Sequence, residues 1–409
     1  MNDPKTKIVA TIGPASSSVP VLRELMRAGM DVARLNFSHG SYEFYAEVIA
    51  NIRELNAELG ISTAILADLQ GPKLRVGVMQ NGSIDVPDGS ELIITTEEMV
   101  GVPGKVSTVY KQFPQDVKPG EMVLLDDGKL RMQVMSTDGR TEVKLKVLSG
   151  GKLTDKKGVN LPNTKVSLPC LTEKDKKDLD FALSQDVDWV GLSFVRSARD
   201  IIELKHTIRA QDKHARVVAK IEKPEALVEI EEIIKESDAL MVARGDLGVE
   251  VPMEKVPLIQ KDIIKRCLAH HRPVIVATQM MESMITSATP TRAEVNDVAN
   301  AVLDHADAVM LSAETSVGRY PVEVVRTMNR ILTEMETTDE MFNVPNPPLG
   351  QDERSISDAI SIAAVRMTMA LPVKAIVTMT HSGYSAFKIS SMRPRANIYA
   401  FTSNPKILC

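Results

Sequence analysis

The chain has 409 residues, with 44% hydrophobic residues and a formal net charge of −5. This length predicts two or three domains, and the slight negative charge gives no basic surface for nucleic acid. No apolar run approaches the ~20 residues of a membrane span, and the N-terminus lacks a signal-peptide core, so a cytoplasmic protein is expected. The three cysteines, Cys170, Cys267 and Cys409, form no Cys-X-X-Cys pair. A disulfide framework and a zinc knuckle are therefore not expected.

Eight short apolar runs recur along the chain, with helix-period stretches between them. The runs are Lys7–Gly13, Val32–Ser38, Thr63–Leu69, Trp189–Val195, Arg216–Glu222, Ala239–Gly245, Pro273–Gln279 and Ala308–Glu314. Near-continuous apolar runs are typical of parallel strands buried on both faces. Eight of them with intervening helices predict a closed (β/α)8 TIM barrel, with a doubly wound open sheet as the alternative.

The predicted helices fill most of the gaps between these runs. They are Val19–Ala28, Phe44–Leu59, Ala198–Ala210, Ala226–Glu236, Leu258–Ala269 and Arg292–His305, followed by Pro321–Glu336. Between the third and fourth runs the pattern changes to short alternating strands with turns such as Pro87-Asp88-Gly89 and Asp126-Asp127-Gly128. An all-β insertion from about Pro72 to Pro169 is predicted there, at the active-site end of the barrel, where it can close as a lid.

A Pro- and Asn-rich stretch, residues 343–348, is predicted to link the barrel to a last α/β unit. That unit is expected to contain a helix at Ile356–Ala370, a strand at Lys374–Met379, a helix through Ser382–Met392 and a strand at Asn397–Ala400. Two strands are too few for a finished doubly wound domain, so a truncated C-terminal domain is expected.

Polar and charged residues collect at the ends of six of the eight predicted strands. Examples are Arg34 to Gly40, Asp68 to Arg75, Lys220 to Lys223, Arg244 to Gly248, Thr278 and Glu314. Active sites of (β/α)8 enzymes lie at these carboxyl ends, and buried charges are costly unless they pair or bind something. The pattern therefore predicts an active site there.

The chemistry of this predicted site follows from charge. Lys220 and Glu222 are two residues apart on one strand and should point to the same side, into the barrel mouth. Glu222 and Asp246, on neighbouring strands, suit a hard divalent cation, and Lys220 beside it would stabilise negative charge on an oxygen. The alternative is a simple Lys–Glu ion pair. Arg34 and Arg75 are candidate phosphate clamps.

Motifs for the common nucleotide folds are missing from the sequence. It contains neither a Walker A sequence nor Gly-X-Gly-X-X-Gly, so a nucleotide must be held in another way. The turn Gly245-Asp246-Leu247-Gly248 is predicted to open a short helix whose free amides would bind a carboxylate or phosphate.

Taken together, the strand-end motifs resemble those of the pyruvate kinase family. The matching runs are Lys7–Pro14, Arg34–Gly40, Asp68–Arg75, Lys156–Pro162, Lys220–Glu222, Ala243–Glu250, Ala277–Met284 and Met310–Thr315. The resemblance implies a barrel domain at 1–71 and 170–337, a β-barrel lid domain at 72–169, and a partial C-terminal α/β domain at 338–409. It implies a phosphotransferase of the final step of glycolysis, which transfers the phosphoryl group of phosphoenolpyruvate to ADP and yields pyruvate and ATP.

The resemblance also assigns roles to residues. Glu222 and Asp246 would ligate Mg2+ or Mn2+, while Lys220 and Arg34 would face the transferring phosphoryl group. The amides of Gly245 and Asp246, with Thr278, would hold the substrate carboxylate, and Thr278 with a water chain is the candidate proton donor. Nucleotide phosphates would contact the residues Asn36, Phe37, Ser38, His39, Arg75 and Lys157. These assignments suit phosphoryl transfer, which depends on positioning and charge neutralisation.

One departure from the family pattern concerns a monovalent cation. Many members bind potassium at positions that match Asn36, Ser38, Asp68 and Leu69, and they carry Thr at the Leu69 position and Glu at the Lys73 position. Here Lys73 would supply an ammonium in place of the ion, as in the potassium-independent branch, so K+ is expected not to be required. The alternative is that Lys73 faces solvent and potassium still binds.

Two rival functions remain open at the level of sequence. A barrel aldolase or lyase acting on a pyruvate-like acid would share Glu222 and Asp246 but would not need Arg75 or Lys157. A catalytically inactive metabolite-binding protein should have lost Lys220, Glu222 or Asp246, and all three are present. The segment Thr380–Ser385 resembles the start of the family's effector phosphate loop, and a homotetramer is expected for the intact protein.

Overall fold

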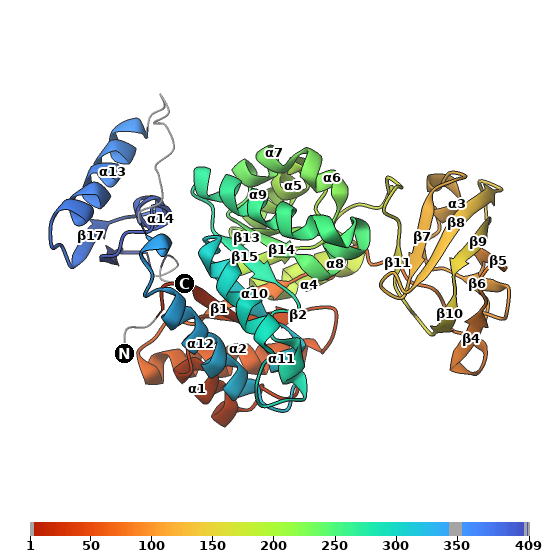
Figure 1. Ribbon diagram of the computed structural model, residues 1–409, viewed down its shortest axis with the longest axis horizontal. Coiled ribbons are helices and arrows are strands. Elements are labelled where there is room, and N and C mark those ends of the chain that lie inside the picture. The colour runs from red at the N-terminus through yellow and green to blue at the C-terminus, as the bar shows by residue number, and fades with distance from the viewer. Residues whose placement is uncertain (1–3, 343–353, 405–406, 408–409) are drawn as a thin grey trace.

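A computed structural model describes residues 4–342, 354–404 and 407. The predicted linker at 343–348 and Cys409 lie outside the described residues. Figure 1 shows a central barrel with a lid made mainly of strands at one end and a small α/β unit at the other. No helix within these ranges is long and apolar enough to cross a membrane.

The central sheet is a closed barrel of eight parallel strands, in the order β1-β16-β15-β14-β13-β12-β3-β2. Its strands are β1 (Lys7–Thr11), β2 (Val32–Asn36), β3 (Ala64–Asp68), β12 (Trp189–Leu192), β13 (Arg216–Ile221), β14 (Ala239–Ala243), β15 (Val274–Ala277) and β16 (Ala308–Leu311). All eight predicted strands are present, and closure rules out the open doubly wound sheet. The strands are buried almost throughout because helices cover the outer face.

Helices surround the barrel, several of them beginning with a capping box. The main ones are α1 (Val19–Arg27), α2 (Tyr42–Leu59), α4 (Glu173–Ser184), α5 (Ala198–Ala210), α6 (Pro224–Val228), α7 (Ile230–Glu236), α8 (Arg244–Glu250), α9 (Val256–Ala269), α10 (Arg292–Leu303), α11 (Ala313–Ser316) and α12 (Pro321–Met335). In α10 the Thr291 side chain and Glu294 satisfy each other's backbone N–H groups.

Three helical details differ from the sequence prediction. The helix α4 was not predicted. The predicted helix Ala226–Glu236 is divided into α6 and α7 at Glu229, whose φ of −103° and ψ of 21° leave the helical region. The predicted strand Ala239–Gly245 ends at Ala243, and Arg244 already begins α8.

The lid contains a six-stranded sheet in the order β11-β7-β8-β9-β5-β6 and a two-stranded ribbon, β10-β4. Its strands are β4 (Ser83–Val86), β5 (Glu91–Thr95), β6 (Lys105–Ser107), β7 (Met122–Leu125), β8 (Leu130–Thr137), β9 (Glu142–Ser149), β10 (Gly151–Thr154) and β11 (Val159–Asn160). Isolated bridges from Arg75 to Gly158 and from Val76 to Thr108 join its two edges. The lid is not purely β, because Phe113–Asp116 forms the helix α3.

The C-terminal unit contains α13 (Ser355–Ala370), β17 (Ala375–Met379), α14 (Tyr384–Ser391) and β18 (Asn397–Phe401), with β17 and β18 parallel. A polar network joins it to the barrel. Lys388 pairs with Asp358 at 2.7 Å and contacts His271, whose Nδ1 lies 2.7 Å from Ser391 Oγ. Burial first, and then Lys388, lower the pKa of His271 to about 4.

The inside of the barrel changes from apolar to charged along β3 and β13. At the amino-terminal end the inward positions are apolar and include Val9, Leu66, Val218, Ala239 and Ile275. Side chains alternate along a strand, so residues two positions further on also face inward. After Leu66 that position is Asp68, and after Val218 it is Lys220. The barrel therefore places a charged layer above an apolar floor.

Candidate active site

The centre of the site is a buried chain of alternating charges. Arg34 Nη2 lies 2.6 Å from Asp68 Oδ2, and Lys220 Nζ lies 3.1 Å from Asp68 Oδ1. Lys220 Nζ is also 3.0 Å from Glu222 Oε1. Only 1% of the Asp68 and Glu222 side chains and about a tenth of the Arg34 and Lys220 side chains are exposed. The Lys–Glu pair is thus part of a larger network that fixes two cations at the barrel mouth.

Neighbouring strands hold this chain in place. Arg34 Nη1 donates to Thr11 Oγ1 at 2.9 Å, and Lys220 Nζ donates to Ser193 Oγ at 2.6 Å. Gly191 faces inward on β12, and a Cβ there would come within 3.0 Å of Asp68 Oδ1. The missing side chain of Gly191 therefore gives the Asp68 carboxylate its space.

Burial and charge act against each other on these groups. Burial opposes ionisation of Asp68, but Lys220 and Arg34 outweigh it and hold the pKa of that carboxyl below its usual value. Burial likewise opposes the charge on Lys220, yet Asp68 and Glu222 raise the pKa of its ammonium. Asp68 and Lys220 are therefore both charged at neutral pH.

Glu222 differs from Asp68, since its negative charge is under-compensated. Burial raises the pKa of Glu222 above its usual range, Lys220 opposes the shift, and the nearby negative charge of Asp246 adds to it. A buried carboxylate with a second carboxylate nearby fits a divalent cation between them. Within the described ranges no group of three or more His, Cys, Asp or Glu side chains is arranged to hold a metal. Glu222 and Asp246 are therefore the two carboxylates that would hold a cation here.

A second part of the site lies where β15 ends and α8 begins. The backbone N–H of Gly245 donates to Thr278 Oγ1 at 2.7 Å, and this hydroxyl donates to the carbonyl of Ala277 at 2.6 Å. Thr278 has a φ of +73° and Gln279 a φ of +54°, both in the left-handed region. The structure thus brings together Thr278 and Gly245, which the sequence analysis placed at the substrate carboxylate.

The segment after β2 leads from the barrel interior to its surface. Phe37 is buried against Tyr45, with ring centroids 4.4 Å apart, whereas His39 is exposed. Asn36 Oδ1 accepts the N–H of Ser38 at 3.2 Å, and Tyr45 Oη donates to the carbonyl of Asn36 at 2.6 Å. Phe37 therefore packs in the core, and its backbone and neighbours are what a ligand can reach.

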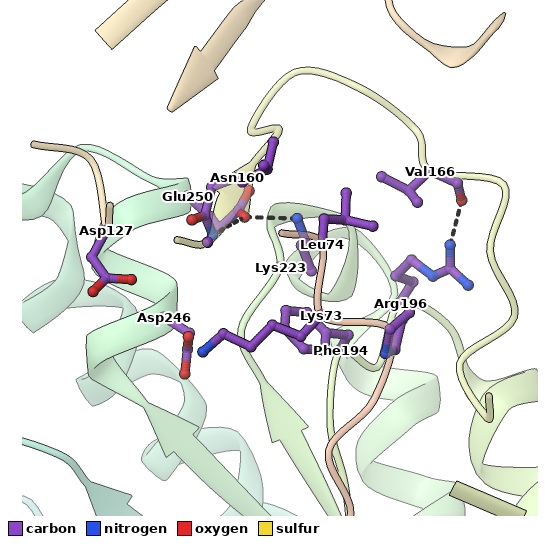
Figure 2. Close-up of a pocket in the computed structure, with 13 residues that line it drawn as sticks. Lys73, Leu74, Asp127, Asn160, Val166, Phe194, Arg196, Lys223, Asp246 and Glu250 are labelled. Carbon is purple, nitrogen blue, oxygen red and sulfur yellow. Dashed lines mark hydrogen bonds and ion pairs between the residues drawn. The ribbon is translucent and has the colours of Figure 1, made fainter. Parts of the chain in front are cut away.

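Leu69 and Lys73 follow β3 toward the lid. Leu69 is buried, and its carbonyl accepts the Ser193 hydroxyl at 2.7 Å. Lys73 lies in a pocket between barrel and lid, and Figure 2 shows its ammonium directed at Asp246. Lys73 therefore does not simply face away from the site into solvent.

The lid residues lie on the other side of the same pocket, which Asp127, Gly158 and Asn160 help to line. Arg75 donates to the carbonyl of Lys156 at 2.9 Å, and Lys157 Nζ pairs with Asp126 at 2.8 Å. Both cations thus have partners within the lid, so binding a phosphate would mean replacing or sharing them.

Several residues of the site had no role assigned to them from the sequence. Asn160 of the lid donates to Glu250 Oε1 at 2.8 Å, and Lys223 Nζ lies 2.7 Å from the same oxygen, as Figure 2 shows. Ser193 was also missed; its position at the end of a predicted strand was the only available signal. Glu314 was noted at a strand end, but its carboxylate accepts the backbone N–H groups of Met281 and Ser312.

The chain is similar to known proteins in both sequence and fold. The family model "Pyruvate kinase, barrel domain" matches residues 3–325, and "Pyruvate kinase, alpha/beta domain" matches residues 358–408. Pyruvate kinases of Geobacillus stearothermophilus and Bacillus licheniformis are 47% and 46% identical over 405 residues, which is 98% of this chain and 69% of each relative. A solved pyruvate kinase from Cryptosporidium parvum superimposes with a TM-score of 0.92 at 38% identity, covering 99% of this chain and 84% of that one. The chain therefore belongs to the pyruvate kinase family.

Proposed function

We propose that the charged layer of the barrel is where this phosphotransferase moves the phosphoryl group of phosphoenolpyruvate to ADP. The observation that carries the proposal is the buried chain Arg34–Asp68–Lys220–Glu222 beside Asp246. It presents two fixed cations together with the Glu222 carboxylate, whose pKa is raised by burial and by the nearby Asp246. Phosphoryl transfer needs such fixed charges more than it needs a covalent catalyst.

In this proposal Glu222 and Asp246 hold Mg2+ or Mn2+, which when bound neutralises charge on the phosphoryl oxygens. Arg34 and Lys220 would contact the same phosphoryl oxygens. Asp68 holds both cations in place through its ion pairs at 2.6 and 3.1 Å. When the phosphoryl group leaves, the Lys220 ammonium stabilises the enolate oxygen that remains.

The substrate carboxylate is proposed to bind the amides of Gly245 and Asp246 together with Thr278. In the structure the Gly245 N–H is already bonded to Thr278 Oγ1, so the carboxylate would take over this donor and free the hydroxyl. Thr278, with water behind it, is then the proposed source of the proton that converts the enolate to pyruvate.

The nucleotide is proposed to lie between the barrel mouth and the lid. Asn36, Ser38 and His39, with the backbone of Phe37, would contact it from the barrel. Arg75 and Lys157 would contact its phosphates from the lid. Lys157 is more than a third exposed, so moving its ammonium from Asp126 to a phosphate costs little desolvation.

Lys73 is proposed to make potassium unnecessary. Its ammonium is directed at Asp246 (Figure 2), and a divalent cation bound at Asp246 would repel it. We propose that the ammonium then takes the place of a monovalent cation near Asn36, Ser38, Asp68 and Leu69. Leu69 has no side-chain oxygen for an ion, and its carbonyl already accepts the Ser193 hydroxyl.

The test is an assay of phosphoryl transfer from phosphoenolpyruvate to ADP, run with and without Mg2+ and K+. Pyruvate is followed through its reduction, and ATP is measured separately. Activity that needs Mg2+ but not K+ is expected, and Lys73→Glu should create a requirement for K+. A many-fold activation of the parent enzyme by K+ would contradict the role of Lys73. Failure to form ATP from phosphoenolpyruvate and ADP would favour one of the rivals, an aldolase or lyase or a catalytically inactive metabolite-binding protein.

We further propose that the protein is a cytoplasmic homotetramer. The proposal rests on the family's use of the C-terminal domain as a subunit interface. Sedimentation equilibrium of the protein would test the assembly, and a monomer at micromolar concentration would contradict it.

A further inference from the structure

The bend after β15 has a backbone conformation that its own residues do not favour. Thr278 and Gln279 are consecutive and both have positive φ, +73° and +54°. A β-branched residue rarely adopts this region, because its side chain crowds the backbone. Such a conformation persists only where the surrounding structure enforces it.

The guanidinium of Arg244 forms hydrogen bonds with the backbone of this bend. Arg244 Nη2 donates to the carbonyl of Thr278 at 2.7 Å and lies 3.5 Å from the carbonyl of Gln279. The same guanidinium forms two hydrogen bonds with Asp297 of α10, at 2.9 and 2.8 Å. The Arg244 side chain is only 13% exposed. A planar donor fixed by a bidentate carboxylate has little freedom to move, so it holds the bend in one position.

These hydrogen bonds determine where the Thr278 hydroxyl points. Arg244 holds the carbonyl of Thr278, and the next residue in the chain, Gly245, donates its N–H to Thr278 Oγ1 at 2.7 Å. A Cβ on Gly245 would lie 3.3 Å from that oxygen, so the two backbones approach closely. Adjacent residues of α8 therefore hold both ends of one threonine.

We propose that Arg244, anchored by Asp297, is a positioning residue of the reaction that acts through Thr278. It holds the left-handed bend so that the Thr278 hydroxyl stays in register with the Gly245 amide. Its guanidinium is turned toward protein acceptors, so its effect reaches the substrate only through the threonine. This inference rests on the proposed role of Thr278 at the substrate carboxylate.

The experiment is a double-mutant cycle with Arg244→Lys and Thr278→Val. Lysine keeps the positive charge but lacks the several N–H donors of the guanidinium. Valine keeps the shape of threonine but lacks the hydroxyl. We expect Arg244→Lys to lower kcat about 10- to 100-fold, since small misplacements of a reacting group have effects of this size, with KM for ADP unchanged within about twofold. In the Thr278→Val background the same change should cost less than about threefold, because residues that act as a unit are non-additive.

Controls separate positioning from folding. Arg272→Lys is the matched control. Arg272 lies just before β15 and away from the site, and its Nη2 donates to the carbonyl of Lys235 at 2.9 Å. It should leave kcat unchanged. If Arg244→Lys unfolds at a much lower temperature than the parent, Asp297→Asn is used in its place. This variant keeps Arg244 and tests only its ion pair with Asp297. All variants are assayed where circular dichroism shows a folded protein.

Each outcome is decisive. Additive losses in the cycle, or a loss that follows only the unfolded fraction, would overturn the inference while leaving the proposed role of Thr278 intact. A Thr278→Val enzyme with parental kcat and parental KM for phosphoenolpyruvate would instead remove the role of Thr278, and the inference with it. Non-additive losses with an unchanged KM for ADP would support both.

Discussion

Asp68 pairs with both buried cations of the site, and Asp68→Asn tests how much the site depends on its charge. Asparagine has nearly the same shape, so the change removes charge and little volume. Asp68 is 1% exposed and pairs with Arg34 at 2.6 Å and with Lys220 at 3.1 Å. Without the carboxylate, Arg34 loses its charge partner and Lys220 keeps only Glu222. Removing one partner of a buried ion pair costs about 3–5 kcal/mol.

This free energy sets the size of the expected effect. For a unit as large as the barrel, 1 kcal/mol shifts the unfolding midpoint by roughly 2–4 °C, so Asp68→Asn should lower it by about 6–20 °C in calorimetry. In the coupled assay kcat should fall by about 100-fold, because both cations lose their fixed positions. The matched control is Asp262→Asn, an exposed pair with Arg266 at 2.8 Å, for which about 0–1 kcal/mol is expected. A midpoint within about 2 °C of the parent would refute the reasoning.

Other predictions concern the lid, the strand packing and the barrel contact with the C-terminal unit. Lys157→Ala should raise KM for ADP about tenfold, the size of one lost charged hydrogen bond, and leave KM for phosphoenolpyruvate unchanged in steady-state assays; equal changes in both would contradict a nucleotide contact. Gly191→Ala should lower stability by about 1–3 kcal/mol in calorimetry, since its Cβ would meet Asp68 Oδ1 at 3.0 Å. Burial, and then Lys388, lower the pKa of His271 from 6.5 to about 4 in the folded protein. Its contribution to the free energy of unfolding is therefore complete above pH 6.5 and is lost as the pH falls toward 4. Allowing for its partial exposure, about 2 kcal/mol should disappear over that range. His271→Gln should flatten the pH dependence of the midpoint, and an unchanged slope would argue against the lowered pKa of His271.

Much of the fold could be predicted because its signals are local. A parallel strand covered on both faces must be apolar along its length, so runs such as Ala239–Gly245 were visible without any partner. The lid was visible for a similar reason, since tight turns need Gly, Asp and Pro. The helix α4 was missed because its sequence, EKDKKDLDFALS, is mostly charged. Its amphipathic face becomes clear only against the barrel.

What the sequence determined by itself is which residue types stand at the strand ends: cations, carboxylates and hydroxyls that an apolar barrel would not otherwise tolerate. Only the tertiary structure decided their partners, because closing the barrel brings together residues far apart in the chain. Arg34 meets Asp68 across 34 positions, and Arg244 meets Asp297 across 53. The left-handed bend at Thr278 has no local signal at all, since threonine does not favour it. That bend exists because packing around it supplies hydrogen bonds that the local sequence cannot specify.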